Sequence, residues 1–174
     1  MNSASQALAS IMAVLLMLAL ESPLLMHLEL SFFAPDLALI SVVWIALNLG
    51  SVSGALTCSV IGFLKDGFVM GTPVGMHMAI YAILFHVIRF LAGKLQVRGV
   101  ATMMITVGVA SLLSTGLFAL LSLIFDKTFD NYELVFHLMV PLALVTAPFG
   151  PMVFYLMDRI DGLFTRKTPG LFGR

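Results

Sequence analysis

Charged residues are scarce in this chain of 174 residues, where Lys, Arg, Asp and Glu together make up only 10%. A soluble domain carries about 25% of such residues. The hydrophobic share is 60%, and the mean hydropathy is +1.08. This composition excludes a soluble enzyme, a secreted disulfide-stabilised scaffold and a disordered tail. Because a spanning helix needs about 20 predominantly apolar residues, it predicts one compact polytopic membrane domain.

Cysteine is almost absent as well. Cys58 is the only one and lies in an apolar run, which excludes an intrachain disulfide and a thiolate metal site. No two histidines lie three or four residues apart beside a carboxylate, so we expect no metal and no other cofactor. The first twenty residues contain no Lys or Arg, and no small-residue cleavage site follows them. We therefore expect residues 7–20 to stay in place as part of a membrane helix.

What the sequence does contain is a series of long apolar runs. Backbone groups have no water partners in hydrocarbon, so each run must be helical. We predict an all-α bundle of about six transmembrane helices in a single integral membrane domain, followed by a basic tail at 158–174. The third run ends at Lys65-Asp66-Gly67, and the fourth opens at Thr72-Pro73. The expected spans cover about 7–26, 30–49, 51–64, 73–92, 99–125 and 134–157.

The placement of positive charge predicts the orientation, because Lys and Arg accumulate in cytoplasmic loops. Seven of the nine flank the turn between the fourth and fifth runs or lie in the tail, and most acidic residues lie at the other end. Counting through six helices then puts both termini in the cytoplasm. The seven residues are Arg89, Lys94, Arg98, Arg159, Arg166, Lys167 and Arg174.

The run at 51–64 carries its small residues on one side, including Gly54, Cys58 and Gly62. Small residues let helix backbones approach closely in lipid, where no hydrophobic force drives helices together. Two interpretations stay open for this small-residue face. The helix is buried inside its own bundle, or the face is a groove that receives a helix from a partner protein.

Two carboxylates lie close to expected helix starts. Asp36 follows Pro35 and fits the first turn of the second helix, where the helix dipole favours negative charge. Asp66 either bonds the free amides at the start of the fourth helix or forms a surface pair with Lys65. In the connection Gly71-Thr72-Pro73-Val74-Gly75, Thr72 is the expected N-cap and Pro73 the first helical residue.

Other polar and irregular features leave alternatives open. His77 and Tyr81 are four residues apart and predict one polar stripe on the fourth helix. Pro141, Pro148 and Pro151 predict either a curved packing helix or a broken helix that lines a transport site. The stretch Ser51-Val52-Ser53-Gly54 lacks the first glycine of a serine-protease turn. Since no nucleophile, base and orienting group converge, we expect no enzymatic activity.

The middle of the chain resembles the MreD family of rod shape-determining membrane proteins. The resemblance rests on Pro35-Asp36, Gly54 and Gly62-Phe63-Leu64, followed by Asp66 and then Gly71-Thr72-Pro73-Val74-Gly75. The motifs cover roughly residues 35–77. The site residues that we single out as partner-binding or structural are Pro35, Asp36, Gly54, Cys58, Gly62, Asp66, Gly71, Pro73 and Gly75.

The resemblance implies a non-catalytic role in the bacterial inner membrane. Such proteins help to direct side-wall peptidoglycan synthesis by binding MreC, and through it they communicate with MreB and with the elongation transpeptidase and polymerase. It also implies a fold similar to the substrate-binding subunits of energy-coupling-factor transporters, with membrane lipid around it. The alternative function is a small-molecule- or lipid-binding membrane subunit of a transporter.

Overall fold

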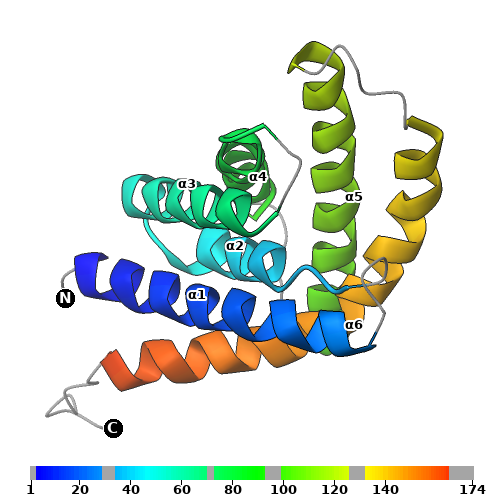
Figure 1. Cartoon of the computed structure of the whole chain (residues 1–174). Coiled ribbons are helices and arrows are strands. Elements are labelled where there is room, and N and C mark those ends of the chain that lie inside the picture. Colours follow the sequence, from blue (N-terminus) through cyan, green and yellow to red (C-terminus); the bar gives the residue numbers. More distant parts are fainter. Residues whose placement is uncertain (1–2, 29–33, 70–72, 93–98, 126–131, 165–174) are drawn as a thin grey trace, which may run out of the picture.

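The computed structural model describes residues 3–28, 34–69, 73–92, 99–125 and 132–164. All regular structure in these ranges is α-helical, which confirms the predicted all-α class (Figure 1). Side chains are placed at 6–19, 34–69, 73–92, 99–125 and 135–162. The helices are α1 (Ser3–Leu28), α2 (Leu37–Asn48), α3 (Ser51–Phe68), α4 (Met76–Ala92), α5 (Val100–Phe125) and α6 (Tyr132–Phe164).

The centre of the molecule is α2, which contacts each of the other five helices. Around it, α3 packs on α4 and α5 packs on α6, while α1 lies against both α3 and α6. The long helix α6 bends, so that its first part runs beside α5 and its last part beside α1 (Figure 1). Pro141, Pro148 and Pro151 lie inside this helix, which continues through all three. The predicted curved packing helix is confirmed.

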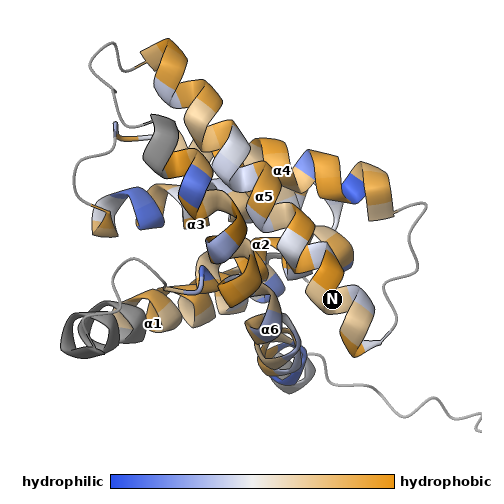
Figure 2. Cartoon of the chain, turned by 90° about the vertical axis from the view of Figure 1, so that its right-hand side faces the viewer, coloured by the Kyte–Doolittle hydropathy of each residue, from blue (hydrophilic) through white to orange (hydrophobic). Residues whose placement is uncertain are grey.

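The interior is apolar and dense. Nine of the twelve residues of α2 are buried, and Trp44 is its largest side chain. Most helical turns carry hydrophobic residues, and strongly hydrophilic residues are confined to a few turns (Figure 2). Among the described residues, two segments are long and apolar enough to cross a membrane, Val100–Phe125 and Val135–Gly162. In each of them only 28% of the most apolar stretch is buried inside the protein. These two helices therefore expose most of their apolar surface.

Some predicted boundaries are wrong. In the run at 30–49, residues 30–33 lie outside the described residues, 34–36 are not helical, and α2 begins at Leu37, because Asp36 caps it and the residue before a proline disfavours helical backbone. Twelve residues rise about 18 Å, which is shorter than the roughly 30 Å hydrocarbon layer. The third helix does not stop at Lys65-Asp66-Gly67 but continues to Phe68. The sixth extends beyond 157 to Phe164.

The start of α4 also differs from the prediction. Pro73 is not the first helical residue, since α4 begins at Met76 after a turn in which the Met76 amide donates to the Pro73 carbonyl oxygen. Gly75 has a φ of +95°, which a residue with a Cβ adopts only under strain. Gly71 and Thr72 lie outside the described residues. So do Lys94, Arg98, and the part of the basic tail from residue 165, on which the predicted orientation depends.

Candidate functional site

A cluster of five polar side chains lies where α2 and α4 begin and α3 ends; we call it the polar cluster. It consists of Asp36, Lys65, Asp66, His77 and Tyr81. Asp66 and His77 are buried, and the side chains of Asp36 and Lys65 are only 17% and 15% exposed. Ionisable groups held inside an apolar helical protein are expensive and mark functional sites.

Asp36 joins the cluster through its position at the start of α2. Its carboxylate accepts a hydrogen bond from the Leu39 amide at 2.9 Å, which confirms the predicted role at the helix N-terminus. The same carboxylate lies 2.5 Å from the Lys65 ammonium and accepts a bond from the Tyr81 hydroxyl. The Asp36 amide donates to Thr146 of α6. One residue thus links α2 to α3, α4 and α6.

Lys65 extends from α3 between two partners. Its ammonium bonds the Asp36 carboxylate and donates to the Tyr81 hydroxyl at 2.9 Å. The interpretation of Lys65 and Asp66 as a surface pair is therefore wrong, because the two side chains leave neighbouring positions of α3 in different directions. No sequence spacing indicated this pairing, since Lys65 and Asp36 are 29 residues apart.

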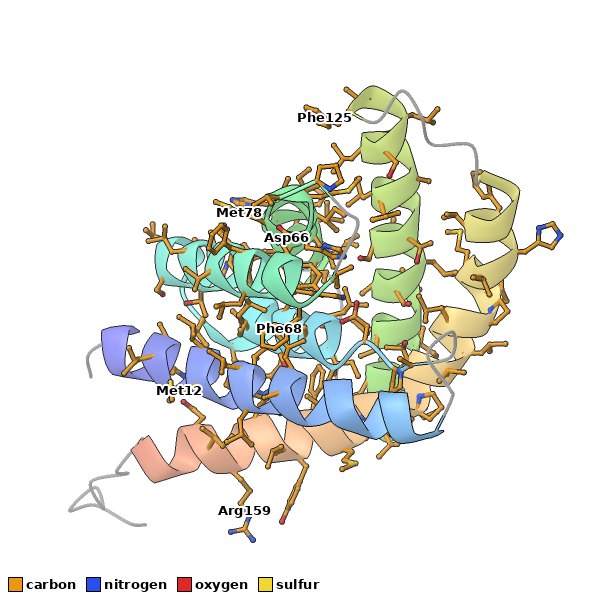
Figure 3. The ribbon with its side chains drawn as sticks, viewed as in Figure 1. Met12, Asp66, Phe68, Met78, Phe125 and Arg159 are labelled. Atoms are coloured by element: carbon orange, nitrogen blue, oxygen red, sulfur yellow. The ribbon has the colours of Figure 1, made fainter. Side chains whose placement is uncertain are left out.

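Asp66 binds the start of α4 and is 7% exposed. Its two oxygens accept from the backbone amides of Gly75 at 2.9 Å and His77 at 3.0 Å, and from that of Met78 at 3.4 Å. The first amides of a helix have no partner within the helix and carry partial positive charge. The interpretation of Asp66 as their acceptor is confirmed, and Figure 3 shows the residue between α3 and α4.

His77 completes the contact. Its Nδ1 lies 2.7 Å from the Asp66 carboxylate, and its ring is 6.2 Å from that of Tyr81, centroid to centroid. On its other side the ring lies 6.0 Å from that of Phe118 in α5. The polar stripe predicted from the spacing of His77 and Tyr81 is confirmed, and it faces the interior of the protein.

Beside the polar cluster is a cavity of about 230 Å³, which we call the cluster cavity. Asp36, Lys65 and His77 form its polar side together with Ser114 and Thr115 of α5. The rest of its wall is apolar. The apolar lining residues are Ile80, Phe118, Val135, Leu138 and Leu142.

The small-residue face of α3 is occupied within the chain itself. A Cβ added at Gly62 would lie 2.5 Å from the His77 carbonyl oxygen, and one added at Gly54 would lie 2.5 Å from the Phe85 ring. Cys58, between them, is fully buried. Of the two interpretations, the helix buried in its own bundle is the one that fits. The groove for a partner helix on this face is wrong, because α4 fills it.

The opposite end of the bundle holds a second set of polar contacts, which sequence reasoning missed. The Trp44 indole donates to Asp158 at 2.7 Å, and the Gln6 amide donates to Asp161 at 2.7 Å. Arg89 does not extend freely to the surface, since its guanidinium donates to the carbonyl oxygens of Ala46 and Leu49 at the end of α2. We call these residues the terminal contacts.

The arrangement offers binding and positioning rather than evident chemistry. Among the residues with described side chains, no three His, Cys, Asp or Glu side chains come together to hold a metal ion. Ser53 donates only to the Gly50 carbonyl oxygen of its own helix start. Asp66 and His77 form a carboxylate–imidazole pair, but every bond of Asp66 serves the start of α4.

Comparison with known proteins identifies one family. Residues 1–160 match the family of the rod shape-determining protein MreD. No curated protein and no solved structure matches the chain. The similarity to energy-coupling-factor subunits therefore stays a prediction.

Proposed function

The chain belongs to the MreD family of rod shape-determining proteins, and from this we propose that it is a scaffold of the cell-elongation complex. Membership makes it a bacterial membrane protein with a role in rod shape determination. The finer proposal is that it acts without catalysis, binds MreC, and so helps to direct side-wall peptidoglycan synthesis. MreB, the elongation transpeptidase and the polymerase would be reached indirectly. The observation that carries this proposal is the family match over residues 1–160.

We also propose six spans with both termini in the cytoplasm. The short helix α2 is surrounded by the other five helices, so it need not cover the whole hydrocarbon layer by itself. The bond between Gln6 and Asp161 supports this arrangement, because it holds the start of α1 and the end of α6 together. Figure 1 shows the start of α1 and the end of α6 on the same side of the molecule. Arg89 lies at this end as well, bound to the end of α2. Positive charge at the end that carries both termini is what a cytoplasmic location requires.

The partner helix needs a surface that α4 does not already cover. A groove between α1 and α3 meets this need, with a volume of about 660 Å³. Five of its nine lining residues are small: Ala7, Gly50, Ser51, Ser53 and Thr57. Small residues permit the close backbone contact on which helix association in lipid depends. We therefore propose this α1–α3 groove, and no longer the Gly54–Gly62 face, as the place where the MreC transmembrane helix binds.

Co-purification tests both the binding of MreC and the assignment of the α1–α3 groove. The protein and MreC are co-expressed, extracted in mild detergent and isolated through a tag on MreC. Leu56→Trp places bulk in the groove, where Leu56 is 64% exposed, and should lower recovery at least fivefold. Leu120→Trp is the matched control, since Leu120 is exposed on α5 away from the groove.

The outcomes distinguish these two claims. If the wild-type protein is not recovered with MreC, the scaffold function is wrong. If recovery is normal for the wild type and for Leu56→Trp alike, only the groove is wrong. If Leu120→Trp lowers recovery as much as Leu56→Trp, added bulk disturbs the protein generally and the groove assignment fails.

A second candidate function is a small-molecule- or lipid-binding subunit of a transporter. The cluster cavity is the observation that favours it, because binding sites combine apolar walls with a few convergent polar groups. A ligand retained at one copy per protein in native mass spectrometry would support this candidate, and its absence would count against it.

A further inference from the structure

The cluster cavity has hydrogen-bonding capacity that the protein does not use. An ammonium has three donors, and Lys65 uses two, toward Asp36 and Tyr81. His77 engages Nδ1 with Asp66, and its Nε2 has no partner in the described part of the chain. Within the same residues, the Ser114 hydroxyl has no partner either. Thr115 donates to Ser111 but keeps its capacity to accept.

These free positions are a mixture of donors and acceptors. Lys65 offers a donor, Thr115 offers an acceptor, and Ser114 offers both. A buried polar group without a partner costs free energy comparable to a lost hydrogen bond. Several such groups around one cavity therefore favour an occupant that both donates and accepts. Hydroxyl groups have this property, whereas purely donating or purely accepting groups do not.

Charge argues against an ionic occupant. The charges of Asp36, Asp66 and Lys65 sum to −1, or to zero if His77 is protonated. An added anion brings the net charge of the cluster to −2 or −1, and an uncompensated charge in a low-dielectric interior is costly. A cation finds no free carboxylate, since Asp36 already binds Leu39, Lys65 and Tyr81, and Asp66 binds three backbone amides and His77. The group that binds in the cluster cavity is therefore expected to be uncharged.

Size and lining define the ligand further. A cavity of about 230 Å³ corresponds to the liquid volume of roughly eight water molecules. It therefore admits a group of about the size of one sugar, and the rest of a longer ligand lies outside it. Val135, Leu138 and Leu142 of α6 give it an apolar side that suits a hydrocarbon chain. Both properties together are those of an amphiphile.

We propose that the cluster cavity binds a neutral amphiphile whose head, about as large as one sugar, carries several hydroxyl groups. Lys65, His77 and Ser114 bond the hydroxyls, and the α6 side chains contact the start of the hydrocarbon chain. This site goes beyond the scaffold function and lies apart from the α1–α3 groove. It does not depend on the binding of MreC.

The test measures protection of one cysteine by three probes of equal chain length. Ser114→Cys is introduced into full-length protein in lipid nanodiscs, where buried Cys58 stays unreactive. A small polar thiol reagent labels Cys at position 114 in the presence of decyl β-glucoside, decyl phosphate or decyltrimethylammonium. We expect saturating glucoside to slow labelling at least tenfold and the two charged probes to change it less than twofold. Val74→Cys is the control, because this residue is 81% exposed outside the cavity.

A cavity-filling variant makes the test specific. Leu138→Trp should abolish protection by the glucoside, whereas Leu138→Met should keep it, and both should keep a cooperative thermal transition. Equal protection by a charged probe would overturn the proposal, and so would no protection by any probe. A cysteine at position 114 that never reacts would overturn it too, because the site must be open to a ligand head.

Discussion

The two ends of the helix bundle hold similar polar residues in different ways. In the polar cluster, Asp36 pairs with Lys65 inside the protein, and Asp66 binds backbone amides and His77. At the other end Asp158 of the terminal contacts binds a neutral partner, the Trp44 indole. That end reaches the surface, and Arg159 beside Asp158 points away from the bundle (Figure 3).

The difference shows where the molecule depends on each charge. A buried charge that loses its partner has no water to replace it, so each member of the polar cluster depends on the others. Asp158 at the terminal contacts is exposed, so it exchanges a lost partner for solvent at little cost. The same substitution should therefore be severe at one end and mild at the other.

The largest effect is expected from Gly62→Leu. Its Cβ would lie 2.5–2.7 Å from backbone atoms of His77 and Met78, which cannot yield as a flexible side chain does. The helix α3 would move away from α4, and Asp66 would lose the amides of α4. We expect a loss well above the roughly 1–3 kcal/mol of ordinary overpacking, and no cooperative thermal transition of the purified protein. The control is Gly67→Leu, where a Cβ has nothing within 4 Å; an equal loss there would contradict this explanation.

The second largest loss of stability is expected from Asp66→Ala. It leaves three backbone amides and the His77 ring without their acceptor inside the protein. Removing one member of a buried charged network costs about 3–5 kcal/mol. Thermal unfolding in detergent would measure the loss, and increased proteolysis near the start of α4 would locate it. A variant as stable as the wild type would show that water replaces the carboxylate.

Lys65→Met should cost about 3 kcal/mol, because Asp36 then stays buried without its counter-charge. Adding Asp36→Leu removes that unpaired charge and should recover most of the loss. A cycle of the two single variants and the double variant measures the coupling between the residues. If the two losses simply add, the ion pair is not what holds these groups in the protein.

The smallest effect is expected at the terminal contacts. In Asp158→Asn the amide oxygen still accepts from the Trp44 indole, so stability should change by no more than about 0.5 kcal/mol. Asp66→Asn is the matched change at the polar cluster and should cost clearly more. Equal thermal shifts for the two variants would remove the distinction between the ends.

Much of the candidate site could be predicted from local sequence. Asp36 beside Pro35 indicated a helix start, and the spacing of His77 and Tyr81 indicated one face of one helix. Lys65 could not be placed in the same way. Its partner is 29 residues away, and only the packing of α2 against α3 and α4 brings the two together. Thr146 of α6, which accepts a hydrogen bond from the Asp36 amide, could not be predicted for the same reason.

The small-residue face of α3 shows what the local sequence decides and what the tertiary structure decides. The positions of Gly54, Cys58 and Gly62 determined that one side of α3 permits close backbone contact, since side-chain size is a local property. Which helix makes that contact is not local, and the structure shows that α4 does. The apolar runs likewise determined that the regular structure of the described residues is helical, because unpaired backbone groups are too costly in an apolar environment. Only the tertiary structure decided that α2 lies at the centre and that the charges meet beside a cavity, because such contacts join residues far apart in the chain.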